Sequence, residues 1–174
     1  ALDAAEAVEV EYEALPFVSQ IADALTPVAP AVWDECPDNV LIDTSFGDKA
    51  ATDRAFAQAD HVTSLDLHIG RVTAVPMELR ACLGAYDTAT GRYTLHAGSG
   101  GAVRQKQELA GVIGIKPDDR RVLSYDGGGN FGSRNRPYPE CGRVLVAAKK
   151  LGRPVKFTAT RSEAFISDYQ GRDL

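Results

Sequence analysis

The sequence predicts an α+β fold, in which helices pack against a mixed sheet, and three patterns along the chain indicate this class. Residues 81–97 alternate apolar and polar side chains on both sides of a turn-forming segment at 87–91, which is typical of a β-hairpin. Residues 102–113 and 138–151 carry apolar side chains at the spacing of amphipathic helices. A short strand pattern at 122–125 separates these two helices, so we expect the sheet to combine hairpin and crossover connections.

Four further segments complete the predicted fold. Residues 7–13 and 65–69 alternate apolar and polar positions, and residues 154–158 also have the pattern of a strand. Asp48 precedes a helical pattern over residues 49–60. We expect it to cap that helix, because an aspartate side chain accepts a hydrogen bond from the free N–H groups of a first turn.

Length and composition favour a single globular domain. The chain has 174 residues, of which 44% are hydrophobic and 25% are charged. These fractions are close to those of an average soluble globular protein, and no apolar run reaches the roughly 18 residues of a membrane span. Because no repeat, low-complexity segment or linker divides the sequence, we expect residues 1–174 to form one domain without a membrane span.

The charge balance makes nucleic acid a poor candidate partner. The chain has 19 Lys and Arg against 24 Asp and Glu, for a net charge of -5. An acidic domain does not attract a phosphate backbone as a whole. One basic cluster stands at the end of the helix predicted at 138–151, where cations favour the helix dipole, and it consists of Lys149, Lys150, Arg153 and Lys156.

The cysteines and histidines do not predict a metal site. The chain has 3 residues of each type, and they are widely spaced: Cys36, Cys82, Cys141, His61, His68 and His96. No pair of cysteines has C-x-x-C spacing, and an odd number of unpaired cysteines is typical of a reducing compartment. The N-terminal residues also lack the basic and apolar regions of a signal peptide, so we expect a cytoplasmic location.

The most informative segment is the glycine-rich sequence DGGGNFGSR at 126–134, between the predicted strand at 122–125 and the following helix. Glycines allow positive φ and a close approach to a ligand, and free N–H groups ahead of a helix bind anions. No Lys followed by Ser or Thr comes after the glycines, and the segment does not open a βαβ unit, so neither a P-loop nor a dinucleotide-binding turn is predicted. A tight turn without a ligand explains the glycines equally well, but it does not explain Phe131.

Several motifs in a fixed order carry a resemblance to a known family. After DGGGNFGSR come YPE, LGRPVK, RSE and GRD, and upstream stand VEVEYEALP, the GD before AFAQAD, and VPMELRACLGAYD. Together they resemble the large, molybdenum-binding subunit of the xanthine dehydrogenase, aldehyde oxidase and carbon monoxide dehydrogenase family. The resemblance covers essentially the whole chain, and it implies that the α+β fold is part of a molybdopterin-binding domain.

The resemblance implies a function and a set of partners. Enzymes of this family hydroxylate a C–H bond with oxygen derived from water, using molybdenum on a pterin, in bacteria often a molybdopterin cytosine dinucleotide. The electrons pass to iron–sulfur clusters and a flavin, which the resemblance places on partner subunits or domains. We therefore expect this chain to belong to an oligomeric oxidoreductase that acts on a small molecule, an aldehyde or an N-heterocycle. Further partners are the remainder of the large subunit.

The resemblance also implies site residues in the glycine-rich segment. The family's loop approaches the molybdenum, and its Phe, here Phe131, lies beside the ligands of the metal. The implied cofactor-binding residues are Gly128, Gly129, Asn130, Phe131 and Gly132. Asn130 replaces the usual glycine, and an asparagine tolerates positive φ best among the other residues. Arg134 replaces the usual lysine, and Asn135 stands where the purine-oxidising branch has an acidic residue, so both are implied to border the substrate pocket.

A second implied cofactor loop precedes the helix at 102–113. Many relatives have a T-Q-x-P-H segment there, whose glutamine binds near the metal. This chain has AGSGGAV, with Gly100 at the position of that glutamine. We therefore expect Ser99 and Gly100 to contact the cofactor through backbone N–H groups and the Ser99 hydroxyl.

The family's catalytic base has no counterpart in these residues. It is a glutamate near the far C-terminus of a much longer chain, so no catalytic residue is predicted here, and the chain is expected to be inactive by itself. Two alternatives to a role as part of the enzyme remain open. One is a non-catalytic assembly or interaction module that retains the fold, and the other is an anion-binding α/β domain that uses the turn at 126–132.

The remaining carboxylates have structural interpretations. For Glu78 we favour a salt bridge with Arg80 or Arg71, and the alternative is that it holds a loop near the cofactor. Glu140 is predicted to favour the dipole of the following helix. Arg161 and Glu163 are predicted to form an ion pair.

Overall fold

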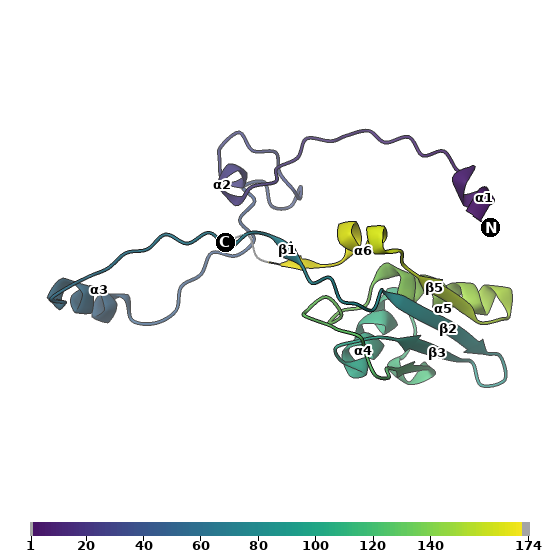
Figure 1. Cartoon of the computed structure of the whole chain (residues 1–174). Coiled ribbons are helices and arrows are strands. Elements are labelled where there is room, and N and C mark those ends of the chain that lie inside the picture. The colour runs from purple at the N-terminus through teal and green to yellow at the C-terminus, as the bar shows by residue number, and fades with distance from the viewer. Residues whose placement is uncertain (1, 172–174) are drawn as a thin grey trace. The chain divides into compact units, whose positions relative to one another are not determined.

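The structure, a computed structural model, describes residues 2–171 (Figure 1). The chain divides into two compact units, which meet between Gly70 and Arg71 in the sequence.

The first unit contains three short helices: α1 (Leu2–Glu6), α2 (Ile21–Ala24) and α3 (Lys49–Gln58). Asp48 caps α3 as predicted, and its Oδ1 accepts from the N–H of Ala51 at 2.8 Å. No residue between 3 and 70 is buried in the structure. The strands predicted at 7–13 and 65–69 do not form, and this prediction was wrong because an alternating pattern gives a strand only where a neighbouring strand pairs with it.

The second unit is built on a sheet of four strands: β2 (Ala81–Asp87), β3 (Arg92–Ala97), β4 (Arg120–Leu123) and β5 (Val155–Thr158). The order is β4-β3-β2-β5; β2 is antiparallel to both β3 and β5, and β3 is parallel to β4. The predicted hairpin is therefore confirmed, with Asp87 paired to Arg92 beside its turn. The parallel pair requires a crossover, which confirms the predicted mixed sheet.

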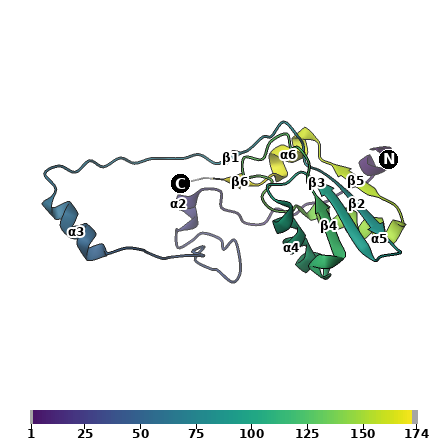
Figure 2. The ribbon, with the colours of Figure 1, turned by 90° about the horizontal axis from the view of Figure 1, so that it is seen from below.

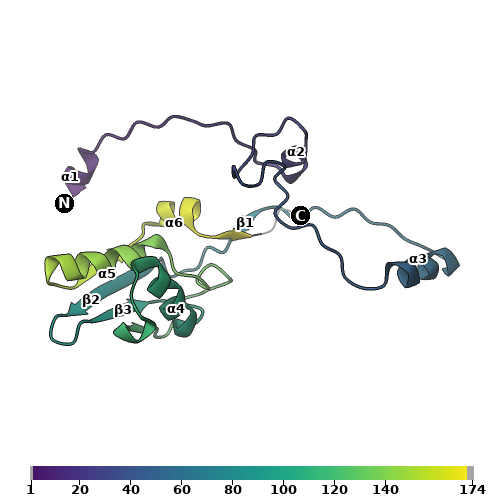
Figure 3. The same cartoon turned by 180° about the vertical axis from the view of Figure 1, so that it is seen from behind.

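Two helices cover one face of this sheet. They are α4 (Ala102–Ile113), which provides the crossover from β3 to β4, and α5 (Pro139–Leu151), which connects β4 to β5. Figure 3 shows both helices in front of the strands, and Figure 2 shows α4 beside β4 and α5 toward β2. The core between them consists of Cys82, Tyr93, Leu95, Ala97, Leu109, Cys141, Val144 and Leu145.

The helix ends follow the sequence signals. Gly152 ends α5 in the left-handed conformation, with φ of 63°, and Lys149 and Lys150 lie in the last turn. A left-handed glycine is a common helix terminator, and cations near a C-terminus favour the dipole. Among the residues described, no helix has the length and apolar character needed to cross a membrane.

The helices α1 and α2 were not predicted from the sequence, and three elements of the second unit were also missed. These are the helix α6 (Arg161–Ser167) and the short antiparallel pair β1 (Val72–Thr73) and β6 (Gln170–Gly171). A capping box begins α6: the Thr160 hydroxyl accepts from the N–H of Glu163, whose carboxylate accepts from the N–H of Thr160 at 2.6 Å. The predicted ion pair between Arg161 and Glu163 was therefore wrong, because Arg161 donates instead to the carbonyls of Pro76 and Met77.

Strand β2 can pack closely against α5 because position 84 in β2 is a glycine. A Cβ at this position would lie 2.7 Å from the carbonyl carbon of Val144 and 2.8 Å from the nitrogen of Leu145, both backbone atoms of α5. Backbone atoms of a packed helix cannot move aside as the end of a side chain can. The absence of a side chain at Gly84 thus fixes the distance between β2 and α5.

Replacing Gly84 by alanine is expected to destabilise the protein by about 1–3 kcal/mol, the usual cost of overpacking a core. Gly111→Ala is the matched control, because Gly111 lies in α4 with no atom within 4 Å of its Cβ position. That variant is expected to gain stability, by up to about 1 kcal/mol, from the better helix propensity of alanine. Chemical denaturation of both variants measures the difference, and equal stabilities would contradict the packing described here.

Candidate cofactor site

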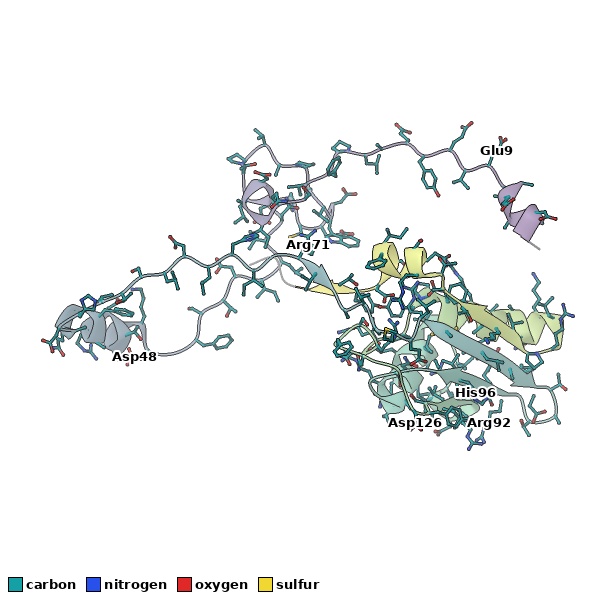
Figure 4. The ribbon with its side chains drawn as sticks, viewed as in Figure 1. Glu9, Asp48, Arg71, Arg92, His96 and Asp126 are labelled. Atoms are coloured by element: carbon teal, nitrogen blue, oxygen red, sulfur yellow. The ribbon has the colours of Figure 1, made fainter. Side chains whose placement is uncertain are left out.

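The glycine-rich segment at 126–134 forms an exposed loop between β4 and α5. It begins at Asp126, which is labelled together with His96 of β3 in Figure 4. The rings of Tyr125 and His96 stack with centroids 6.0 Å apart. Three of its residues have positive φ: Gly129 at 121°, Phe131 at 48° and Gly132 at 94°. Because a bulky residue at positive φ is strained, the conformation of Phe131 must be imposed by its neighbours. The Phe131 side chain is 79% exposed, so burial of its ring within the described chain does not impose it.

The side chain of Asn130 imposes this turn. Its Oδ1 accepts from the N–H of Gly132 at 3.1 Å and from the N–H of Arg134 at 3.0 Å. Its backbone carbonyl accepts from both the N–H and the hydroxyl of Ser133, each at 2.9 Å. These bonds close the loop around Phe131. The Asn130 oxygen is therefore engaged within the loop, and its amide nitrogen donates to Asn135 Oδ1 at 3.1 Å.

Glu78 holds the start of the same loop. Its carboxylate accepts from the N–H of Gly128 at 2.5 Å, and its own N–H donates to the Gly128 carbonyl at 3.2 Å. A Cβ at Gly128 would lie 2.7 Å from the Cβ of Glu78, so only a glycine fits there without a shift of the backbone. The favoured interpretation of Glu78 as a partner of Arg80 was wrong, because Arg80 pairs with Glu140 and Asp168, and the alternative, that Glu78 holds a loop, is confirmed.

The second loop implied by the sequence lies against the first. The N–H of Gly100 donates to the Arg134 carbonyl at 2.9 Å. The hydroxyl of Ser99 accepts from the N–H of Gly101 at 3.3 Å. An open cavity of about 250 Å³ lies where the two loops meet, and its lining consists of Glu78, Gly98, Ser99, Gly127, Gly129, Asn130 and Arg134.

A buried ion-pair network holds the end of the glycine-rich loop through Arg134. The carboxylate of Asp168, after α6, accepts from Arg80 through Oδ1 and from Arg134 through Oδ2, the latter at 3.1 Å. Arg134 also donates to the carbonyl of Glu78 at 3.2 Å. Arg80 pairs in addition with Glu140 at 3.3 Å, so Glu140 does more than favour the helix dipole. Arg134 thus borders the cavity while its guanidinium is buried in the network.

Electrostatics and aromatic stacking complete this network. The guanidinium of Arg80 lies 4.3 Å from the centre of the Tyr138 ring, and the Tyr138 hydroxyl donates to the Ser133 carbonyl at 2.7 Å. The pKa of Arg80 is raised above its usual value. Burial alone would lower this pKa, but the hydrogen bond to Asp168 and the negative charges of Glu140 and Asp168 have the larger combined effect. Burial raises the pKa of the Tyr138 hydroxyl. Both groups therefore keep the protonation states that their hydrogen bonds require.

Sequence reasoning missed Arg80, Tyr138 and Asp168. Arg80 and Asp168 are 88 residues apart, and no motif joins them. The available signal was weak: Arg80 stands within the VPMELRACLGAYD motif and Tyr138 within YPE, both of which carried the resemblance.

The loops present a surface that fits an anionic, hydrogen-bond-accepting group. The backbone N–H groups of Gly127 and of the consecutive residues Gly129, Asn130 and Phe131 have no hydrogen-bond partner in the described chain. Consecutive N–H groups in a turn that includes left-handed residues form an anion-binding concavity. A molybdopterin, which carries a phosphate and pterin carbonyls, matches these donors. Within residues 2–171, no three His, Cys, Asp or Glu side chains gather where they could hold a metal ion directly.

Comparison with protein-family models identifies the family. Residues 32–174 match the model of the molybdopterin cofactor-binding domain. The chain belongs to this family. The resemblance drawn from the sequence motifs is thereby confirmed.

Individual relatives agree with the assignment to the family. The chain is 34% identical to the carbon monoxide dehydrogenase large chain of Hydrogenophaga pseudoflava, over 97% of this chain and 23% of that one. It is 36% identical to the nicotine 6-hydroxylase large subunit of Paenarthrobacter nicotinovorans, over 95% of this chain and 20% of that one. The chain thus spans less than a quarter of the length of these relatives.

Solved structures confirm the predicted fold. The CO dehydrogenase from Oligotropha carboxidovorans superposes with a TM-score of 0.84 at 29% identity, over 99% of this chain and 23% of that chain. The aldehyde oxidoreductase from Desulfovibrio gigas superposes with a TM-score of 0.80 at 25% identity, over 97% of this chain and 18% of that chain. The α+β arrangement of a mixed sheet and helices is therefore that of molybdenum hydroxylases.

Replacing Asp168 by asparagine is expected to destabilise the protein by about 3–5 kcal/mol, because the variant leaves two buried guanidinium groups without their shared negative charge. The side chain of Asp168 is only 1% exposed. Asp118→Asn is the matched control, because the Asp118 side chain is 99% exposed and pairs loosely with Lys106 at 3.5 Å. Its effect is expected to stay within about 0.5 kcal/mol. Denaturation curves of the two variants measure this difference, and similar losses in both would contradict the role of the network.

Proposed function

We propose that this chain is part of the large subunit of a molybdenum hydroxylase, in which the loops at 98–101 and 126–134 border a bound molybdopterin. One observation carries the proposal beyond membership of the family. Two glycine-rich loops, 25 or more residues apart in the sequence, border one cavity of about 250 Å³, and the second loop has backbone N–H groups without a partner in the described chain. We also propose that residues 1–174 act as one domain of that subunit.

The protein's part in the chemistry is to hold and orient the cofactor. Backbone N–H groups of Gly129 and Phe131 would donate to it, together with the Ser99 hydroxyl. The other proposed contacts are Gly100, Gly128, Asn130 and Gly132. When bound, the cofactor supplies a molybdenum centre that accepts two electrons as a substrate C–H bond is oxidised with oxygen from water.

Phe131 has a role of its own in this proposal. Its ring is 79% exposed on a loop whose backbone is fixed by Asn130 and Glu78. A fixed apolar ring beside a reacting centre excludes water and limits the orientations of a substrate. This role explains why a large apolar residue interrupts a run of glycines.

The substrate and the partners are inferred from the family to which the chain belongs. We infer a small aldehyde or N-heterocycle as the substrate, and Arg134 and Asn135 are the proposed border of its pocket. The remainder of the large subunit and partners with iron–sulfur clusters and flavin would complete an oligomeric enzyme. The cytosine dinucleotide form of the cofactor and a cytoplasmic location remain predictions from the sequence.

A second candidate function is that of a non-catalytic assembly module. It is favoured by the first unit, in which large apolar side chains are exposed, among them Tyr12 at 88%, Phe17 at 81% and Phe46 at 94%. Exposed apolar residues in such number indicate a surface that other protein covers. The presence of the cofactor distinguishes the two functions. An assembly module would occur in a complex that has no molybdopterin at this cavity, whereas the enzyme subunit would bind it there.

Phe131→Ala in the complete parent protein is expected to lower kcat by on the order of 10-fold, because loss of a group that orients the substrate removes part of the positioning effect. The melting temperature and the molybdenum content are expected to stay unchanged, since the ring is exposed. Steady-state kinetics, normalised to molybdenum measured by mass spectrometry, test this.

Phe165→Ala on α6, where the ring is 48% exposed, is the control for loss of an exposed phenylalanine. It is expected to leave kcat unchanged. Full turnover by Phe131→Ala at full molybdenum content would contradict the proposed role of the loop.

A further inference from the structure

Three residues at which this chain departs from the family pattern form one contact group in the structure. A Cβ on Gly100 would lie 2.3 Å from Asn135 Oδ1 and 2.4 Å from Asn130 Nδ2. These two atoms are the ones joined by the 3.1 Å hydrogen bond between the asparagines. The space that a side chain at position 100 would occupy is therefore filled by the Asn130–Asn135 amide pair.

We propose that Asn130 is a positioning residue of the cofactor site, and that Gly100 and Asn135 are needed to keep its amide in place. The inference rests on the proposed function. It adds that the conformation of Phe131 is set by a side-chain contact between the two loops and not by the glycines alone.

The orientation of the Asn130 amide is set by its hydrogen-bond partners. Its oxygen faces the N–H groups of Gly132 and Arg134, at 3.1 Å and 3.0 Å. If the amide rotated by half a turn, its NH₂ group would face these two donors, and all three groups would lose their hydrogen bonds. Asn135 opposes that rotation, because its oxygen accepts from Asn130 Nδ2. Asn135 thus selects the rotamer with which Asn130 closes the turn around Phe131.

Gly100 joins the loop at 98–101 to the glycine-rich loop. The N–H of Gly100 donates to the carbonyl of Arg134, the residue whose own N–H is held by Asn130. The two loops are thus joined through the backbone of Arg134, which binds Gly100 through its carbonyl and Asn130 through its N–H. Any side chain at position 100 separates the amide pair and releases this turn.

The group also has a chemical consequence for the ligand. Asn130 borders the cavity, and one hydrogen of its NH₂ group is used by Asn135. Its second hydrogen and the free N–H groups of Gly129 and Phe131 are all donors. The site therefore favours a ligand atom that accepts several hydrogen bonds, such as an oxo or phosphate oxygen.

A double-mutant cycle in the parent holoenzyme tests the proposal. Gly100→Ala meets only the ends of two flexible side chains, so the amide pair is expected to separate without unfolding of the protein. We expect kcat to fall on the order of 10-fold, since displacements of about 1 Å near a reacting centre cost up to on the order of 10²-fold. We also expect an altered Mo(V) electron paramagnetic resonance signal and a changed molybdenum and pterin content per chain. Gly111→Ala is the control, because Gly111 lies in α4, outside both loops, and nothing lies within 4 Å of its Cβ position.

The second arm of the cycle repeats Gly100→Ala in an Asn130→Gly background. There the alanine has no amide pair to displace, so its additional effect on kcat and on the resonance signal is expected to vanish. Asn130→Asp, which keeps the accepting oxygens, is expected to retain much more activity than Asn130→Ala. If Gly100→Ala does not accumulate in cells, the exposed Asn135→Ala provides the same test, with a smaller loss of kcat expected.

The possible results separate this inference from the proposed function. A parent protein that contains no pterin would contradict the proposed function itself. A pterin-containing parent in which Gly100→Ala equals Gly111→Ala, or in which the effect of Gly100→Ala is the same in both backgrounds, would overturn the positioning role. Wild-type kinetics for Asn135→Ala would do the same.

Discussion

The carboxylate of Asp168 holds together segments that are far apart in the sequence. It binds Arg80 at the start of β2 and Arg134 at the end of the glycine-rich loop, and it is almost completely buried. A buried carboxylate is stabilised only if both oxygens have partners, and here each oxygen faces a guanidinium. Because Arg134 also binds the Glu78 carbonyl, the position of the loop follows from this one ionic contact.

The loop above this contact is ordered by hydrogen bonds to its backbone. Glu78 holds Gly128, and Asn130 holds Gly132 and Arg134. The N–H groups of Gly127, Gly129, Asn130 and Phe131 remain unpaired within the described chain. Donors that are already ordered before binding lose little conformational entropy when a ligand binds. They therefore bind the ligand more tightly than flexible donors would. The buried ion-pair network therefore positions the loop whose free N–H groups form the open site.

Much of this architecture was predictable from the sequence because it is local. The hairpin of β2 and β3, the helices α4 and α5, and the cap at Asp48 each depend on neighbouring residues. The interpretation of residues 7–13 and 65–69 as strands failed because alternation does not supply a pairing partner. The roles of Glu78 and Asp168 depend on partners 50 and 88 residues away, which no local pattern encodes. The contact between Gly100 and the two asparagines is also non-local, although each residue stood out as a departure from the family pattern.

The central claim is that the two glycine-rich loops bind the cofactor, and hydrogen exchange of the parent protein with and without molybdopterin tests it most directly. Amides of Gly129 and Phe131 lack partners in the described chain and are expected to exchange quickly in the cofactor-free protein. Loading the cofactor is expected to slow exchange in the segments 98–101 and 127–132, while the amides of β2 and β3, already paired in the sheet, change little. Slowed exchange in these two segments would support the account. Unchanged exchange there, in protein shown to contain the cofactor, would contradict it.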